Sequence, residues 1–203
     1  MPLERRGATK KEVVKDFRTG EIADAARRVI SELGYPDASM ERIAQEAGVS
    51  KGTLYLYFRN KRALLLTAIE HSFGELMTDT RLRTERVEGC EAKLAELVRA
   101  WVEHTNEQRA FFRVLQMVGP EFSEEIRGLQ EIHLSFVAEL LEKGLRDREL
   151  RQLDPVPLAR LLVNLLRGTS LARLNESDPP DGKQDVATIV DVLLHGIGAG
   201  DPS

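Results

Sequence analysis

The residues with the clearest chemical potential lie in one short stretch, 48–61, which reads GVSKGTLYLYFRNK. A Ser-Lys-Gly run is followed by three aromatic residues, Tyr55, Tyr57 and Phe58, within four positions. In a helix these three rings span too much of the circumference to share one buried face. Hydroxyl, ammonium and phenol groups on the outside of a short helix can donate to phosphate oxygens and base edges. The stretch is therefore a candidate nucleic-acid contact.

Several of these side chains suit the sugar-phosphate backbone. The Ser50 hydroxyl and the free N–H groups at a helix start can bind a phosphate. Lys51 and Lys61 bracket the helix with positive charge, and Gly52 lets the backbone approach closely. The Tyr57 hydroxyl can donate to a phosphate.

Other side chains suit the bases. Thr53, Tyr55 and Leu56 can reach base edges or thymine methyl groups, whereas Phe58 is expected to turn inward as core. The alternative is that the tyrosines are packing residues and the Ser-Lys-Gly run is only a helix cap.

Helical spacing of apolar residues recurs along almost the whole chain, and no segment has the alternation of a strand. Ser39, Ser50, Asn60 and Asp154 are expected helix caps. Gly34, Gly48 and the Gly119-Pro120 pair are expected helix ends. The sequence therefore predicts an all-α protein of about nine helices. The expected helices cover 17–34, 40–47, 51–57, a long segment after residue 60, 92–106, 111–118, a long segment from residue 123, 155–173 and 184–197.

Two short helices joined by AGVSKG have the spacing of a helix-turn-helix. Gly48 permits a left-handed turn residue between them. Ile43, Ala44, Val49 and Leu54 are expected to hold the second helix by its inner face. Its N-terminal end and outer face are then free to enter a major groove.

The segment SMERIAQEAGVSKGTLYLYFRNKRALL (39–65) resembles the N-terminal signature of the TetR family of bacterial transcriptional repressors. The resemblance covers about 17–70. It implies an all-helical homodimer with a helix-turn-helix head. It also implies a C-terminal domain that binds a small molecule and dimerises through its last two long helices.

The resemblance also assigns DNA contacts to individual positions. It implies helix-start phosphate contacts by Ser39 and Ser50, and it places Thr53 and Leu56 where the family varies with operator sequence. Many relatives have a polar residue at the position of Leu56, so an apolar contact is expected there. The remaining implied contacts are Lys51, Gly52, Tyr55, Tyr57 and Lys61.

Charge is unevenly distributed along the chain, whose net charge is −4. Residues 1–70 carry a net charge of +3 and residues 71–203 a net charge of −7. This suits a small DNA-binding head on an acidic body, although such a difference also arises by chance. The expected domains are a flexible basic arm (1–16), a helix-turn-helix domain (17–62) and a ligand-binding and dimerisation domain (63–203). Arg5, Arg6, Lys10, Lys11 and Lys15 of the arm either contact DNA or belong to a solvated tail; we favour the tail.

The second domain is expected to enclose a ligand cavity, with apolar walls and a few polar groups. Each candidate also has a structural reading: the aromatics as plain core, the histidines as satisfied or exposed residues, and Arg167 as a surface or dimer-interface residue. Asn164 and Arg167 share one helix face, and the charge of Arg167 needs a partner there, such as an acidic ligand, a glutamate or the other subunit. The candidates are Trp101, His104, Phe111, Phe112, Leu115, Met117, His133, Phe136, Asn164 and Arg167.

The last two long helices, 155–173 and 184–197, are apolar over about half of their circumference. Pairing with the same helices of a second subunit would bury that surface. A buried position within a larger monomeric bundle is the alternative.

Other functional classes find little support. The single cysteine, Cys90, excludes an internal disulfide framework, and neither a secretory signal nor a membrane-spanning apolar run is present. We find no metal-ligand spacing, no nucleophile near a histidine and no phosphate-binding glycine loop. We therefore expect a cytoplasmic protein that is not an enzyme and needs no cofactor or metal.

The expected function is a repressor released from a palindromic DNA operator by a small lipophilic effector. An activator with the same head, an all-helical enzyme and a non-specific DNA-binding protein are the alternatives.

Overall fold

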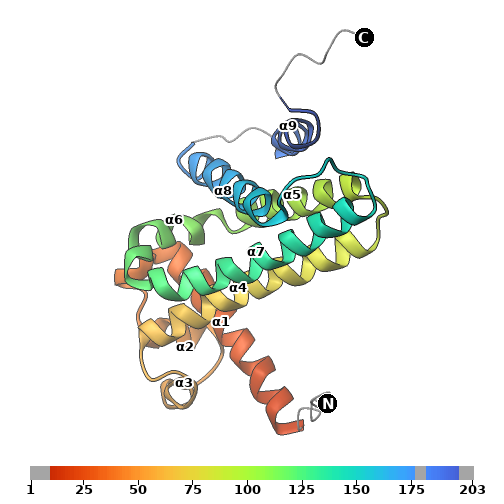
Figure 1. The fold of residues 1–203 in the computed structure, drawn as a ribbon. Helices are drawn as coiled ribbons and strands as arrows, with labels where there is room; N and C mark the ends of the chain where they lie inside the picture. Colours follow the sequence, from red (N-terminus) through yellow and green to blue (C-terminus); the bar gives the residue numbers. More distant parts are fainter. Residues whose placement is uncertain (1–9, 177–181, 197–203) are drawn as a thin grey trace, which may run out of the picture. The chain divides into compact units, whose positions relative to one another are not determined.

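The computed structural model describes residues 10–176 and 182–196; in these ranges it contains nine α-helices, one short 3-10 helix and no strand (Figure 1). The all-α prediction is confirmed. By its contacts the chain divides into two compact units, Met1–Ser72 and Phe73–Ser203. The division falls inside α4, ten residues beyond the domain boundary expected from the sequence. The helices are α1 (Lys10–Asp37), α2 (Met40–Glu46), α3 (Lys51–Tyr57), α4 (Lys61–Glu85), α5 (Cys90–Glu107), α6 (Arg109–Val118), η1 (Gly119–Phe122), α7 (Ser123–Arg146), α8 (Pro155–Leu174) and α9 (Gly182–His195).

Four short polar side chains begin helices as predicted. Ser39 and Ser50 each accept a hydrogen bond from the backbone N–H three residues on, at 3.1 and 3.0 Å. Asn60 does the same at 2.8 Å, and Asp154 accepts from the backbone N–H two residues on at 3.1 Å. These bonds satisfy N–H groups that have no partner within the helix.

The first helix is longer than the sequence suggested. It begins at Lys10, so residues 10–16, which we expected in a flexible arm, are helical. Residues 10–19 contain no Gly or Pro, and extending an existing helix costs little once it is nucleated. Arg5, Arg6 and the side chains of Lys10 and Lys11 lie outside the described residues. The exposed Lys15 is part of α1, where its carbonyl accepts a bond from Thr19.

The first unit is built around α1 and the pair α2 and α3. Ile22, Ile30, Ile43 and Leu54 are fully buried, and Phe58 turns inward as expected. Gly48 has a φ of 64° between α2 and α3, a conformation that side chains other than Gly or Asn adopt at a cost. The Val49 N–H then donates to the Ala44 carbonyl at 3.0 Å and closes the turn.

The second unit packs α5, α7, α8 and α9 around one apolar core. Leu97, Val137 and Leu166 are fully buried there, with Leu162 and Ile189 nearly so.

The helix α6 is attached to the carboxyl end of α8. Arg109 donates to the carbonyl of Arg173 at 2.7 Å, and Arg113 donates to the carbonyl of Leu174 at 2.8 Å. Carbonyls in the last turn of a helix lack partners within the helix. The two arginines therefore serve as a cap supplied by another helix.

One very close approach joins α5 and α7. Cys90, the first residue of α5, is 4% exposed and packs directly against Gly144 of α7. A Cβ atom at residue 144 would lie 2.5 Å from the Cys90 sulfur and 2.9 Å from its Cβ. The Cys90 N–H also donates to the Glu149 carboxylate, so the start of α5 is held in place. Only a residue without a Cβ fits at position 144.

Candidate DNA-binding surface and effector site

The helix α3 is held from one side and exposed on the other. Leu54 is fully buried, whereas Leu56 is 84% exposed and Tyr55 46% exposed. Lys51 and Gly52 are exposed as well, and Thr53 and Tyr57 are half-buried. An 84% exposed leucine gains nothing from the fold of the free protein, so a partner surface is the natural place for its burial. The predicted outer face of α3 is therefore present in the structure.

The Ser50 side chain is already engaged in the fold. Its oxygen accepts from the Thr53 N–H and shares a second hydrogen bond of 2.8 Å with the Thr53 hydroxyl. Ser39 caps α2 in the same manner. These residues fix the starts of the two helices, and a phosphate would meet backbone N–H groups that the caps orient.

An acidic residue that sequence reasoning did not consider pairs with Lys51. The ammonium group of Lys51 donates to the carboxylate of Glu41 on α2. The hydrogen bond and the charge of Glu41 raise the pKa of Lys51 above its ordinary value. Both side chains are exposed, so salt screens the pair. Lys51 must exchange Glu41 for a phosphate if it is to contact DNA.

Lys61, a predicted DNA contact, is engaged within the fold of the free protein. Its ammonium group donates to the carbonyls of Tyr35 and Pro36 at 2.7 and 3.0 Å, and lies 4.6 Å from the centre of the Tyr35 ring. Lys61 therefore ties the start of α4 to the end of α1. No sequence pattern predicts this contact, because the partners are 25 and 26 residues away along the chain.

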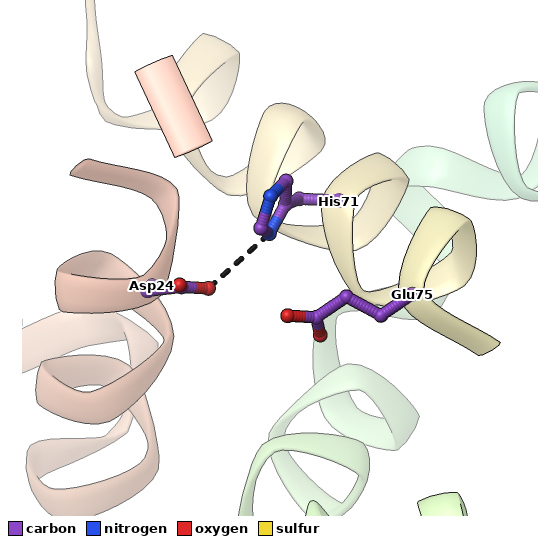
Figure 2. A group of neighbouring side chains, drawn as sticks. All are labelled: Asp24, His71 and Glu75. Atoms are coloured by element: carbon purple, nitrogen blue, oxygen red, sulfur yellow. Dashed lines mark ion pairs between the residues drawn. The ribbon is translucent and has the colours of Figure 1, made fainter. Parts of the chain in front are cut away.

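A second tie between α1 and α4 involves His71. Figure 2 shows its imidazole facing Asp24 of α1, with 3.2 Å between His71 Nδ1 and Asp24 Oδ1. The figure also draws Glu75, which follows His71 by one turn of α4. Asp24 accepts a further bond from Arg27 at 2.8 Å. Within the first unit, Lys61 and His71 thus fix the beginning of α4 against α1 at two points.

In the second unit, two predicted effector residues form an aromatic stack. The rings of Trp101 and His133 are 4.8 Å apart and almost parallel, at 8°. Phe73, which the sequence did not single out, meets His133 edge-on at 6.1 Å. The Trp101 indole N–H donates to Ser170 at 2.8 Å. We name Phe73, Trp101 and His133 the aromatic cage.

Three other predicted residues form a separate group at the junction of α5 and α6. His104 contacts the edge of Phe112 at 6.1 Å between ring centres, and Phe112 contacts Phe111 at 6.3 Å. Phe111 is 1% exposed and packs as core. Leu115 is half-buried on α6, whereas Met117 is 82% exposed and lines no wall.

The structure does not bring Asn164 and Arg167 to the aromatic cage. Both lie on the exposed face of α8, and Arg167 donates to Gln130 of α7 at 3.1 Å. Leu161 and Leu165 share this face and are 61% and 38% exposed. Helix α8 is apolar on two sides, and the side away from this exposed face contributes to the core. The two polar residues therefore belong to an outward surface and not to a cavity wall.

The second unit has at least two cavities among its described residues. One of about 250 Å³ lies between the end of α4, the start of α5 and α7, with Phe136 and Leu140 on its apolar side. We name it the α7 cavity. A second, of about 320 Å³, lies between α5 and α9. Of the predicted effector residues, only Phe136 lines either cavity, and the guanidinium group of Arg81 lies 4.8 Å from the centre of its ring.

Burial controls the chemistry of two side chains in this unit. His133 is 1% exposed, and the loss of hydration lowers its pKa to about 4. Burial likewise raises the pKa of the Cys90 thiol to about 11. His133 is therefore uncharged at neutral pH, and Cys90 is a thiol with little thiolate character.

Comparison with known proteins gives consistent matches. Residues 22–68 match the family model described as "Bacterial regulatory proteins, tetR family". The fatty acid metabolism regulator protein of Bacillus subtilis is 26% identical over 147 residues, or 70% of this chain and 76% of that protein. An HTH-type transcriptional repressor of Mycobacterium tuberculosis is 27% identical over 188 residues, or 89% and 92% of the two chains.

A solved structure, the fatty acid degradation regulator FadR from Bacillus halodurans, aligns with a TM-score of 0.77. It is 26% identical and covers 89% of this chain and 96% of its own. Among the helices of the described residues, none has the length and apolarity needed to cross a membrane.

Proposed function

Because this chain belongs to the TetR family of bacterial transcriptional regulators, we propose that it is a repressor that binds a palindromic operator as a homodimer and is released by a small lipophilic effector. The observation that carries the proposal is α3, which is fixed by Leu54 and presents Tyr55 and the 84% exposed Leu56 outward. The Mycobacterium tuberculosis relative is named a repressor, which supports the sign of regulation proposed.

On DNA, the roles divide by position along α3. Lys51 and the capped helix starts at Ser39 and Ser50 contact phosphates, and Gly52 allows close approach of the backbone. Tyr55, Leu56 and Thr53 face the bases, with Leu56 making an apolar contact such as one to a thymine methyl group. Tyr57 donates to a phosphate. Lys61 contributes mainly by holding α4 against α1, and its charge adds to the field at the phosphates.

The exposed face of α8 supports a homodimer formed with α9. Leu161 and Leu165 on α8 and Val192 on α9 are exposed apolar residues. A second copy of the same helices would cover this surface symmetrically. Asn164 and Arg167 lie beside these leucines on the exposed part of α8 and would supply polar contacts within that interface.

Replacement of Leu161 by Asp tests this interface. We expect the variant to sediment as a monomer, because a carboxylate cannot be buried without a partner. Its operator affinity should fall at least about tenfold, since one head contacts only a half-site. The matched control is Leu82→Asp on α4, where an equally bulky leucine is 47% exposed. If Leu161→Asp remains a dimer, the interface lies elsewhere.

The effector is proposed to act by population shift. It binds the second unit in a conformation whose heads do not match the operator, and its effect cannot exceed its differential affinity for the two conformations. A coupling of about 1–3 kcal/mol would weaken operator binding roughly 5- to 150-fold. The names of the Bacillus subtilis and Bacillus halodurans proteins refer to fatty acid metabolism, which makes acyl compounds the first class of effector to test.

The direct test is selection of random duplex DNA by the purified protein, with the bound pool sequenced. We expect a palindromic consensus whose half-sites lie about one helical turn apart. A transcriptional reporter that carries this consensus then gives the sign of regulation: deletion of the protein should raise expression. Absence of any consensus at several salt concentrations would contradict the proposed function.

Replacement of Glu41 by Gln tests how α3 is positioned on DNA. The change frees Lys51 and removes a negative charge near the phosphates, so operator affinity should rise several-fold. The salt dependence should steepen by up to about one unit in the slope of log K against log salt, because the phosphate contact of Lys51 then no longer replaces an ion pair within the protein.

The control for this test is Glu32→Gln, an equal change of charge at an exposed residue of α1. Affinity measured by anisotropy at four salt concentrations should separate the two variants. Equal slopes for both variants would contradict the exchange of Glu41 for a phosphate at Lys51.

A further inference from the structure

His133 is a buried polar residue with an unpaired ring nitrogen. It is 1% exposed, and its Nδ1 atom has no hydrogen-bond partner among the described residues. Buried polar atoms are almost always paired, and an exception calls for an explanation. A phenylalanine or leucine would fill the same space without leaving a polar atom unpaired. Packing alone therefore does not explain a histidine at this position.

The surroundings of His133 are apolar and aromatic. Trp101 stacks on one face of the ring at 4.8 Å, and Phe73 meets it at 6.1 Å. The polar atom of Trp101 is already engaged with Ser170, whose hydroxyl in turn lies 3.4 Å from that of Thr105. Within the aromatic cage, the imidazole is therefore the polar group that remains available to bind a ligand.

The α7 cavity comes close to this group. Its wall includes Phe136, which follows His133 by three residues on α7 and so lies on the same side of the helix, about 4.5 Å further along its axis. Leu140 continues the wall by one more turn. Phe136 therefore belongs both to the wall of the α7 cavity and to the side of α7 that carries His133.

We propose that the aromatic cage is the inner end of the effector site, entered from the α7 cavity past Phe136. We further propose that its ligand is a lipophilic molecule with an uncharged hydrogen-bonding group, such as a hydroxyl, ester or amide, placed against His133. The inference rests on the proposed function and names the class of its effector.

The lack of charge follows from the contacts of His133. The rings of Trp101 and Phe73 offer no counter-ion, and burial favours the uncharged imidazole. A neutral imidazole has one donor and one acceptor nitrogen, so it can pair with a hydroxyl or a carbonyl. A carboxylate or an ammonium group would be buried there without an opposite charge, which is strongly unfavourable.

The chain offers a built-in reporter for the test, because Trp101 is its single tryptophan and belongs to the proposed site. The full-length protein is titrated with decanol, methyl decanoate, decanoate and decyltrimethylammonium while Trp101 fluorescence is recorded. We expect saturable changes with decanol and methyl decanoate. Decanoate and decyltrimethylammonium should bind at least about tenfold more weakly, because their charges would be buried unpaired.

Two variants isolate the hydrogen bond. His133→Phe keeps an aromatic ring and should weaken decanol binding roughly three- to tenfold, the contribution of one hydrogen bond, while decane binding is unchanged. His133→Gln keeps a hydrogen-bonding side chain and should retain the preference for decanol over decane. The matched control is Ser135→Ala, which removes a hydroxyl from the exposed side of α7 and should behave as the wild type.

The outcomes separate this inference from the proposed function. Tighter binding of decanoate than of decanol, or equal decanol affinity in wild type and His133→Phe, would overturn the inference. So would a DNA-releasing effector that leaves Trp101 fluorescence unchanged; the protein would still select a palindromic operator, and the proposed function would stand. Failure to select any operator would contradict the proposed function, whatever the Trp101 titrations show.

Discussion

Between pH 6.5 and pH 4, the free energy of unfolding of the wild type is expected to fall by up to about 3 kcal/mol more than that of a His133→Phe variant. The pKa of His133 is about 4 in the folded protein, against 6.5 for an unperturbed histidine. In this pH range the unfolded state therefore binds more protons, so acidification favours unfolding. This penalty is small above pH 6.5, where His133 is mostly uncharged in both states, and it grows as pH falls toward 4.

Urea unfolding of both proteins at half-unit intervals of pH measures this difference directly. Other groups titrate in the same range, but they are common to the two proteins and cancel in the comparison. At neutral pH, His133→Phe should in addition be more stable by about 1 kcal/mol, because no buried nitrogen is left unpaired. Parallel curves of stability against pH would show that His133 does not become buried in its neutral form on folding.

Replacement of Gly144 by Ala is expected to destabilise the protein by about 1–3 kcal/mol, a typical cost of overpacking. In an unobstructed helix the same substitution would stabilise by roughly 0.5–1 kcal/mol. Here the new Cβ atom would lie 2.5 Å from the Cys90 sulfur. Neither residue can move without cost, because Gly144 is part of the last turn of α7 and the Cys90 N–H is bonded to Glu149.

Three further variants check the physical reason. Gly128→Ala lies on the same helix, where an added Cβ atom meets nothing within 4 Å, and it should be neutral or stabilising. Cys90→Ala removes the sulfur, so the double variant with Gly144→Ala should lose less stability than the two single changes together. Thermal unfolding of the wild type and the four variants measures these differences in stability. A stabilised Gly144→Ala would mean that α5 and α7 can separate freely.

Local features of the structure were predictable from the sequence. Ser39, Ser50, Asn60 and Asp154 cap helices because a short polar side chain can bond only to N–H groups a few residues away. Gly48 marks the turn between α2 and α3 for an equally local reason, the backbone conformation that it allows. The exposed face of α3 followed because Leu54 fixes which side of so short a helix is buried.

Contacts between distant residues were not predictable. Lys61 and Lys51 look alike in the sequence, yet one binds the carbonyls of Tyr35 and Pro36 and the other pairs with Glu41. Helical periodicity places Asn164 and Arg167 on one face of α8, but α8 has apolar residues on both sides. Periodicity alone therefore could not tell which side faces the core. The aromatic cage likewise depends on Phe73, whose pairing with His133 spans 60 positions of the chain.

Because Arg109 and Arg113 of α6 cap α8, the order of the last turn of α8 depends on the position of α6. The last amides of α8 resist hydrogen exchange only while the final turn stays closed, and that closure relies on guanidinium groups carried by α6. A movement of α6 would thus appear as faster exchange near Arg173 and Leu174, even if the leucines of the core kept their places. Hydrogen exchange at the carboxyl end of α8 therefore reports the position of α6.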